Sequence, residues 1–416
     1  MKLVSDHGNR KNAIPLFIPN SLGTFRAVSL PPPYFPVQAN RAGEGVLKSI
    51  TTSCVAANQT TGHCLASPPA AITTLNKPKT NRLVLSSDMH SFINVQNKEV
   101  TIRVAVEGSG PLIVCVHGWP ELWYSWRHQL SYFSERGYKV AAIDVRGYGG
   151  SSQPHDIAAY TLRNLASDVV AVIDALDDSP SRQKNSHGQA ILFGHDWGAP
   201  IVWNTSILHP EHIRAVAGLS VPFNGISETA FIDIAEIIYK DKFFYQSYFQ
   251  AEGVAEAEFE ADIAMSLRKT YFSISGDAPL NKFLENKPAN AKFLDGLVNP
   301  DVFPSWLTEA DLQVFVDAFT TTGFRGPLNR YRAQRIDAAN MTEHVGSLIT
   351  QPSFFIGGEK DPVRSFVPGM DLYENPLSGG ADFRGSVIIP NVGHWVQQEA
   401  PLETNIALEG FLSQLK

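Results

Sequence analysis

Four apolar runs in this chain are followed closely by residues that could take part in catalysis. The runs are LIVCV, AILFG, SFFIGG and SVIIP, and the residues behind them are His117, His195 with Asp196, Glu359 with Asp361, and His394. Asp196 lies in a Gly-x-Asp-x-Gly pattern, where one large group of hydrolases carries a serine nucleophile. The chain order of acid, acid and histidine matches the nucleophile, acid and base of those enzymes. We therefore predict that Asp196, Asp361 and His394 form a catalytic triad.

An aspartate in this pattern predicts attack on a saturated carbon. An aspartate carboxyl group, with an ordinary pKa of about 3.9, is about 99.9% ionised at pH 7, so Asp196 needs no base before it attacks. A carboxylate is a poor nucleophile toward an amide carbonyl. Its natural target is a carbon that bears a leaving group, as in an epoxide or an alkyl halide. The expected product of this step is an ester between Asp196 and the substrate.

Hydrolysis of that ester needs a base and a site for the oxyanion that develops. His394 is the candidate base, and Asp361 would hold its tautomer, although Glu359 lies only two residues away. The backbone N–H groups of Trp119 and Trp197 are the candidate oxyanion donors. One such donor contributes about 2.7–4 kcal/mol in other hydrolases.

The elements that would position these residues alternate between short β-branched runs and longer helical stretches. Residues 100–108 alternate like a half-exposed strand, whereas runs within 111–118, 138–147, 189–196, 213–221 and 352–358 are typical of buried parallel strands. Residues 122–137 and 161–176 are typical of helices. This alternation predicts an α/β protein with a mostly parallel, doubly wound sheet, whose site lies beyond the carboxyl ends of the strands.

Five motifs resemble those of a known family. They are VHGWPELWYSWRHQL, DVRGYGGSSQP, GHDWGA, GGEKDPV and VGHWVQQEAP. In this order they are similar to the soluble epoxide hydrolases of the α/β-hydrolase fold, from about residue 89 to the C-terminus. The resemblance implies a hydrolase core over residues 89–220 and 341–416, a helical lid over residues 221–340, a small-molecule epoxide and water as substrates, and no metal or organic cofactor. It also favours Asp361 over Glu359.

The resemblance further implies two lid tyrosines that bind the epoxide oxygen and protonate it as the ring opens. The matching positions are Tyr245, in FFYQSYFQ, and Tyr331, in GFRGPLNRYR. A phenol with an ordinary pKa of about 10 stays protonated at neutral pH and is matched as an acid to an alkoxide. Tyr248 competes with Tyr245 for this role, and Arg330 departs from the aromatic residue expected before Tyr331.

Composition and charge exclude several classes of protein. The 416 residues are 44% hydrophobic and 18% charged, with a net charge of −7. We find no apolar stretch long enough for a membrane span and no cluster of basic residues that would bind nucleic acid. Cys54, Cys64 and Cys115 have no metal-like spacing, which favours a reducing, cytoplasmic setting.

Residues 1–88 differ in character from the rest of the chain. They carry nine Lys and Arg against three Asp and Glu, with scattered prolines and clusters of Ser and Thr. This composition predicts a disordered or loosely packed N-terminal extension. It is an upstream tail, a stretch that precedes a functional start at Met89, or an organelle transit peptide.

Two other functions use the same residues. A haloalkane or haloacid dehalogenase would share the nucleophile, base and acid, with Trp119 and Trp197 as halide donors, but it would not need two tyrosine acids. A binding protein that kept the fold without turnover would not need the complete catalytic set. An esterase is disfavoured, because aspartate replaces serine at position 196.

Overall fold

The computed structural model describes residues 90–177, 188–279, 283 and 287–415. The expected N-terminal extension over residues 1–88 and the alternative start at Met89 lie outside these described residues. None of the described helices combines the length and the apolar character that are needed to cross a bilayer.

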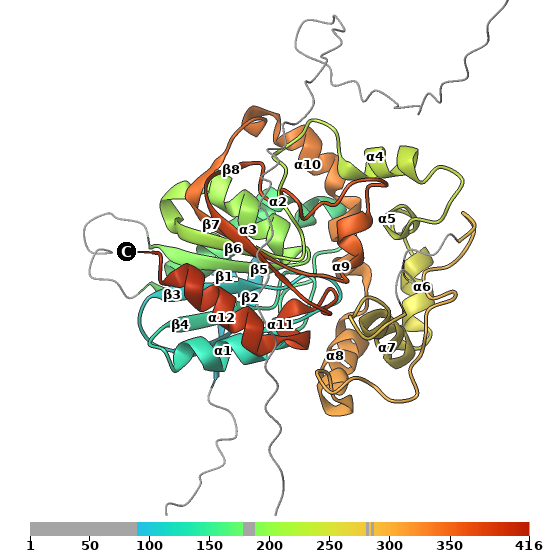
Figure 1. Cartoon of the computed structure of the whole chain (residues 1–416), viewed down its shortest axis with the longest axis horizontal. Coiled ribbons are helices and arrows are strands. Elements are labelled where there is room, and N and C mark those ends of the chain that lie inside the picture. The colour runs from blue at the N-terminus through green and yellow to red at the C-terminus, as the bar shows by residue number, and fades with distance from the viewer. Residues whose placement is uncertain (1–89, 178–187, 280–282, 284–286, 416) are drawn as a thin grey trace, which may run out of the picture. The chain divides into compact units, whose positions relative to one another are not determined.

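A single eight-stranded sheet runs through the described chain in the order β1-β2-β4-β3-β5-β6-β7-β8 (Figure 1). Its strands are β1 (Ser91–Asn97), β2 (Val100–Gly108), β3 (Leu112–Val116), β4 (Lys139–Ile143), β5 (Ala190–His195), β6 (Ile213–Leu219), β7 (Ile349–Gly358) and β8 (Gly380–Ile389). The β1–β2 and β2–β4 pairs are antiparallel, and all other neighbouring strands are parallel. The prediction of an α/β fold with a mostly parallel sheet is confirmed.

The edge strand β1 is not predicted by the sequence pattern. Only Val95 is buried among its side chains, so the strand has no apolar run that would mark it. It forms a hairpin with β2, paired from Ser91 with Val106 to Asn97 with Val100. Backbone pairing with a well-formed neighbour, rather than burial of side chains, therefore supports this strand.

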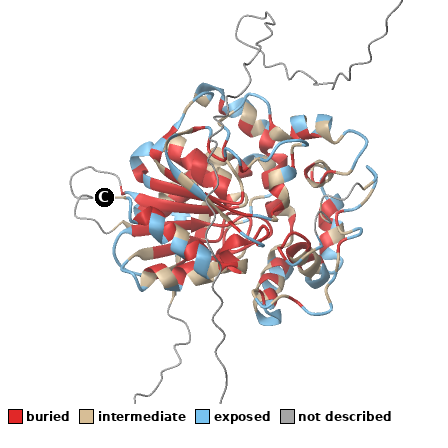
Figure 2. Cartoon of the chain, viewed as in Figure 1, coloured by how far each residue is buried: buried red, intermediate tan, exposed pale blue. Residues whose placement is uncertain are grey.

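Helices cover both faces of the sheet, with α1 and α12 on one side and α2 and α3 on the other (Figure 1). The α-helices outside the segment between β6 and β7 are α1 (Arg127–Ser134), α2 (Leu162–Leu176), α3 (Gly198–Leu208), α11 (Val396–Glu399) and α12 (Pro401–Leu412). The short 3₁₀ helices are η1 (Trp123–Trp126), η2 (Ile157–Tyr160), η4 (Pro210–His212), η5 (Thr342–His344) and η6 (Pro362–Ser365). In α2, the buried residues Leu165, Val169, Val172 and Ile173 recur at helical spacing. Buried residues are concentrated along the sheet (Figure 2), and every residue of β5 is buried.

The chain between β6 and β7 is largely helical. Its helices are α4 (Phe231–Ile238), α5 (Tyr245–Tyr248), α6 (Val254–Glu260), α7 (Ile263–Ser273), α8 (Glu309–Thr322), α9 (Arg325–Arg332) and α10 (Gln334–Asn340). A capping box between Thr308 and Asp311 begins α8, which ends at Gly323 with a φ of 63°. These helices lie within residues 221–340, the segment in which a helical lid is expected.

Candidate active site

Asp196 stands on a sharp turn between β5 and α3. Its φ is 49°, in the left-handed region that a residue with a side chain rarely adopts. The turn requires glycine on both sides, because a Cβ at Gly194 would collide with the carbonyl of Gly198, and a Cβ at Gly198 would collide with that of Val116. The Gly-x-Asp-x-Gly pattern thereby presents the Asp196 carboxylate at the carboxyl end of β5.

His394 and Asp361 lie beside Asp196, on the loops that follow β8 and β7. Nε2 of His394 is 3.3 Å from Oδ2 of Asp196, and Nδ1 of His394 is 2.9 Å from Oδ2 of Asp361. Both His394 and Asp361 are only 3% exposed. The structure thus brings together the three residues that the sequence predicts as a triad.

The two acidic candidates after β7 have different surroundings. Glu359 is exposed, and its Oε2 accepts the backbone N–H of Asn391 at 2.9 Å. Asp361 is buried, and its Oδ1 accepts the backbone N–H of Val363 at 2.9 Å. The contact with His394 is therefore made by Asp361 and not by Glu359.

Tyr373 is a further residue of the site that sequence reasoning missed. Its buried hydroxyl lies 2.7 Å from Oδ2 of Asp361 and 2.6 Å from the carbonyl oxygen of Ser220. Tyr373 belongs to the irregular segment between β7 and β8, where neither a motif nor a periodic pattern marks it. No signal in the sequence alone could have identified this contact.

The charges around His394 set its protonation state. Burial lowers the pKa of His394, but the negative charge of Asp361 and the hydrogen bonds to Asp196 and Asp361 outweigh burial and raise this pKa well above its ordinary value. Burial raises the pKa of the Asp361 carboxyl, yet His394 and the Tyr373 hydroxyl bring it below its ordinary value. In the resting state, the imidazole is therefore protonated and Asp361 is ionised.

Backbone donors lie beside the Asp196 carboxylate. The N–H of Trp119 donates to Oδ1 of Asp196 at 2.7 Å. A Cβ at Gly118 would collide with this carboxylate and with the backbone nitrogen of Trp197, so only glycine at position 118 lets the loop after β3 approach the Asp196 turn this closely. Trp197 is also the N-cap of α3, where the helix dipole favours negative charge.

A buried pair of Glu121 and His195 joins two loops of the site. Nδ1 of His195 is 2.7 Å from Oε2 of Glu121, which also accepts the backbone N–H of Gly118 at 3.0 Å. Nε2 of His195 lies 2.8 Å from the carbonyl oxygen of His394. The pair therefore ties the loop after β3 to the loop that carries His394.

Tyr245 and Tyr331 approach each other near Asp196, with ring centroids 5.9 Å apart. Burial and then the charge of Asp196 raise the pKa of Tyr245, and burial is also the main cause that raises the pKa of Tyr331, so both phenols are protonated at neutral pH. The Tyr248 hydroxyl instead donates to Oε2 of Glu258 at 2.8 Å. Only Tyr245 of these two α5 tyrosines lines the cavity next to Asp196.

Arg330, the residue that departs from the family pattern, is only 3% exposed. It forms an ion pair with Asp337 and donates to the carbonyl oxygen of Tyr160. Its guanidinium lies over the Trp197 ring, 4.8 Å from the centroid, and this ring packs against Tyr331 at 5.2 Å. Asp337 thus compensates the buried positive charge of Arg330 beside the candidate site.

A cavity of about 520 Å³ extends from Asp196, Trp197 and Tyr245. Its wall is largely apolar and includes Leu162, Phe223, Ile226, Phe231, Ile234 and Met341. This volume falls within the roughly 300–1,000 Å³ that is usual for small-molecule sites. The arrangement can hold an apolar molecule whose reactive end meets the carboxylate.

Known proteins share this architecture and much of the sequence. A family model described as the alpha/beta hydrolase fold matches residues 111–401. The chain is 36% identical over 325 residues to epoxide hydrolase A of Mycobacterium tuberculosis, covering 77% of this chain and 97% of that protein. It is 33% identical to epoxide hydrolase 2 of Siraitia grosvenorii, covering 77% and 97%. The solved structure of an epoxide hydrolase from an endophytic Streptomyces superposes with a TM-score of 0.73 at 38% identity, covering 79% and 97%.

The eight-stranded sheet, the residues at its strand ends and the family match define an α/β hydrolase. The chain belongs to the α/β-hydrolase-fold epoxide hydrolases. The resemblance that its motifs carry is thereby confirmed.

Proposed function

We propose that this epoxide hydrolase converts an epoxide and water into a vicinal diol through a covalent ester on Asp196. The observation that carries the proposal is the position of the Asp196 carboxylate, whose Oδ1 accepts the Trp119 N–H at 2.7 Å while Oδ2 lies 3.3 Å from Nε2 of His394. The same carboxylate lines the cavity together with Tyr245. A nucleophile, an oxyanion donor, a base and an acid can therefore reach one substrate molecule.

In the first step, Oδ2 of Asp196 attacks one carbon of the epoxide ring. The bond between this carbon and the ring oxygen breaks, and its electron pair passes to the oxygen. Tyr245 or Tyr331 gives a proton to this oxygen, leaving a tyrosinate and a hydroxyl group on the substrate. Oδ1, which already accepts the Trp119 N–H, becomes the carbonyl oxygen of the ester.

In the second step, His394 takes a proton from water, and the water oxygen attacks Cγ of Asp196. The backbone N–H groups of Trp119 and Trp197 bind the oxyanion that develops on Oδ1, and Asp361 stabilises the imidazolium. The ester bond then breaks, and the departing diol oxygen takes the proton back from His394. The new carboxyl proton of Asp196 passes to the tyrosinate, so that one epoxide and one water yield one diol.

Esterification also prepares His394 for its role as a base. In the resting state, the hydrogen bond to ionised Asp196 helps to raise the pKa of His394. The ester carries no negative charge, so this contribution is lost in the intermediate and the pKa falls. A larger fraction of His394 then gives its proton to solvent and can accept a proton from water. When the ionised Asp196 carboxylate is restored, His394 takes up a proton from solvent and returns to its resting state.

We propose that residues 221–340 act as the lid over this chemistry and that the substrate carries a bulky apolar group. Tyr245 and Tyr331 belong to α5 and α9 of this segment, and the hydroxyl of Tyr271 in α7 donates to the carbonyl oxygen of Pro120 at 2.9 Å. The apolar wall of the cavity supports the substrate class, because each buried methylene contributes about 0.8 kcal/mol to binding.

The covalent route is tested by a single-turnover reaction of excess enzyme with an aromatic epoxide in ¹⁸O-water. In the first turnover, the incoming diol oxygen comes from Asp196, so the expected diol is unlabelled and the label enters the enzyme. Labelled diol would mean direct attack by water and would overturn the ester mechanism. Release of halide from a matched alkyl halide, with no diol from the epoxide, would favour a dehalogenase instead.

A further inference from the structure

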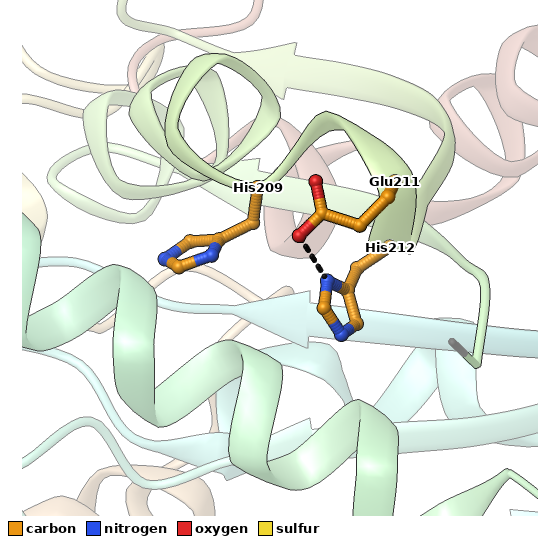
Figure 3. Close-up of side chains that lie close together, drawn as sticks. All are labelled: His209, Glu211 and His212. Carbon is orange, nitrogen blue, oxygen red and sulfur yellow. Dashed lines mark hydrogen bonds and ion pairs between the residues drawn. The ribbon is translucent and has the colours of Figure 1, made fainter. Parts of the chain in front are cut away.

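Three potential metal ligands gather at the turn between α3 and β6. His209 is the C-cap of α3, and Glu211 and His212 belong to η4, which leads directly into β6. One ligand atom from each of these residues lies within 4.8 Å of the other two. Figure 3 shows the Glu211 carboxylate between the two imidazole rings. Two imidazoles and a carboxylate form a ligand set that suits zinc and similar divalent transition metals.

The environment of His212 orients this ring. Its side chain is 6% exposed, with Nδ1 3.1 Å from Oε1 of Glu211 and Nε2 3.5 Å from Oδ1 of Asp174 in α2. In metal sites, a carboxylate commonly pairs with the ring nitrogen that does not bind the ion and so selects the tautomer. Asp174 is placed to hold Nε2 in this way, which directs Nδ1 toward Glu211.

The backbone of the turn is fixed by hydrogen bonds from outside it. The side-chain amide of Gln351 donates to the carbonyl oxygen of Pro210 at 3.3 Å, and that of Gln189 donates to the carbonyl oxygen of Glu211 at 3.1 Å. Within the turn, the His212 N–H donates to the carbonyl oxygen of His209 at 3.0 Å. The residues are therefore held near one another by the fold itself.

We propose that His209, Glu211 and His212 bind one divalent transition-metal ion, with Zn²⁺ as the probe, and that Asp174 supports His212 from outside the ligand shell. The ion takes the place of the proton between His212 Nδ1 and the Glu211 carboxylate, this proton passes to solvent, and water completes the coordination. Ligands at about 2.1 Å from zinc lie at most about 4.2 Å apart. The half-buried His209 and the exposed Glu211 therefore rotate slightly inward around the ion.

The proposed metal site lies at the amino ends of the parallel strands, whereas the catalytic site lies at their carboxyl ends. Asp196 follows the carboxyl end of β5, whereas the turn precedes the amino end of β6, and the 11 residues of α3 separate the two. A helix of this length spans about 16 Å. The ion would join the end of α3 to the start of β6 and stabilise the fold without taking part in catalysis.

The test compares zinc binding by the full chain and by His209→Asn and Glu211→Gln variants. His344→Asn is the matched control, since His344 also follows a glutamate, with Nε2 3.7 Å from Oε1 of Glu343, but belongs to no such cluster among the described residues. Zinc retained after dialysis is counted by plasma mass spectrometry, and Tm is measured with and without zinc. Other zinc-binding groups of the chain contribute equally to every variant, so the difference reports this site.

We expect the unmodified chain and His344→Asn to retain one zinc more than either site variant, and zinc to raise their Tm. Asp174→Asn should weaken zinc affinity by about 10- to 100-fold. Diol formation should be the same in all variants, which also shows that they are folded. Equal zinc content in the unmodified chain and the two site variants would overturn the proposal and leave the cluster as an ion pair only. Loss of the same zinc in His344→Asn would overturn it as well.

Discussion

Oδ2 of Asp196 and Nε2 of His394 lie 3.3 Å apart, with the histidine buried. The contact has opposite consequences in the two proposed steps. While Asp196 is ionised, it helps to keep His394 protonated, and a protonated histidine cannot activate water. Esterification of Asp196 removes this effect, so the same pair of residues separates attack on the substrate from hydrolysis of the ester.

The His394→Gln variant should accumulate the ester on Asp196. Attack by Asp196 does not need the base, whereas ester hydrolysis should slow by about 10²- to 10⁴-fold without it. Mass spectrometry of the intact protein after mixing with an epoxide should show the mass of the adduct. The control is Asp196→Ala combined with His394→Gln, which should form none; an adduct in this double variant would place the ester on another residue.

Removal of the Asp196 charge should lower the pKa of His394. In Asp196→Asn, Asp361 still raises this pKa, but the charged partner at Nε2 is lost. NMR titration of the imidazole should therefore give a midpoint below that of the unmodified chain, so that the ring is deprotonated at lower pH. An unchanged midpoint would show that Asp196 does not control the protonation of His394.

Replacement of both Tyr245 and Tyr331 by Phe should slow ring opening by about 10²- to 10⁴-fold, because the leaving alkoxide would lack an acid. The rate of ester formation in a single turnover measures this step. Tyr248→Phe is the matched control, since its hydroxyl donates to Glu258 rather than lining the cavity. If Tyr248→Phe slowed ester formation by a similar factor, Tyr245 and Tyr331 would not be the specific acids of ring opening.

Tyr373→Phe should slow hydrolysis of the ester and lower the stability of the fold. The variant loses the hydroxyl beside Asp361 and leaves the buried Ser220 carbonyl without this donor, at a cost of about 1–3 kcal/mol in the free energy of unfolding. Denaturant unfolding and single-turnover kinetics measure the two effects.

Tyr239→Phe serves as the control for this variant. The Tyr239 hydroxyl also donates to a backbone carbonyl, that of Phe366, at 2.7 Å. Its removal should lower stability but leave ester hydrolysis unchanged. If Tyr373→Phe and Tyr239→Phe slowed ester hydrolysis equally, the Tyr373 hydroxyl would contribute only to the stability of the fold.

A series of terminal epoxides with lengthening alkyl chains should test the proposed substrate class. If each added methylene is buried in the cavity of about 520 Å³, about 0.8 kcal/mol per methylene raises kcat/KM by roughly fourfold at each step. The gain should cease when the cavity is full. A flat or falling series from the shortest member onward would contradict a bulky apolar substrate.

Most of the fold and the candidate triad could be predicted from the sequence, for a definite physical reason. Buried parallel strands appear in the sequence as short apolar runs, and their carboxyl ends meet at one edge of the sheet. Residues that follow β5, β7 and β8 are therefore brought together although they are far apart in the chain. The glycines around Asp196 also predict the sharp turn, because only glycine fits on either side of it.

The tertiary structure decided which way individual side chains of the candidate site point. Sequence spacing leaves Tyr245 and Tyr248 as alternatives, but packing turns one toward the cavity and the other toward Glu258. The contact of Tyr373 with Asp361 likewise depends on the path of an irregular segment. The sequence around one residue of such a contact does not indicate which residue it meets. The sequence by itself therefore determined the fold class, the family and the order of the strand-end residues, while three-dimensional packing alone decided which side chains meet there.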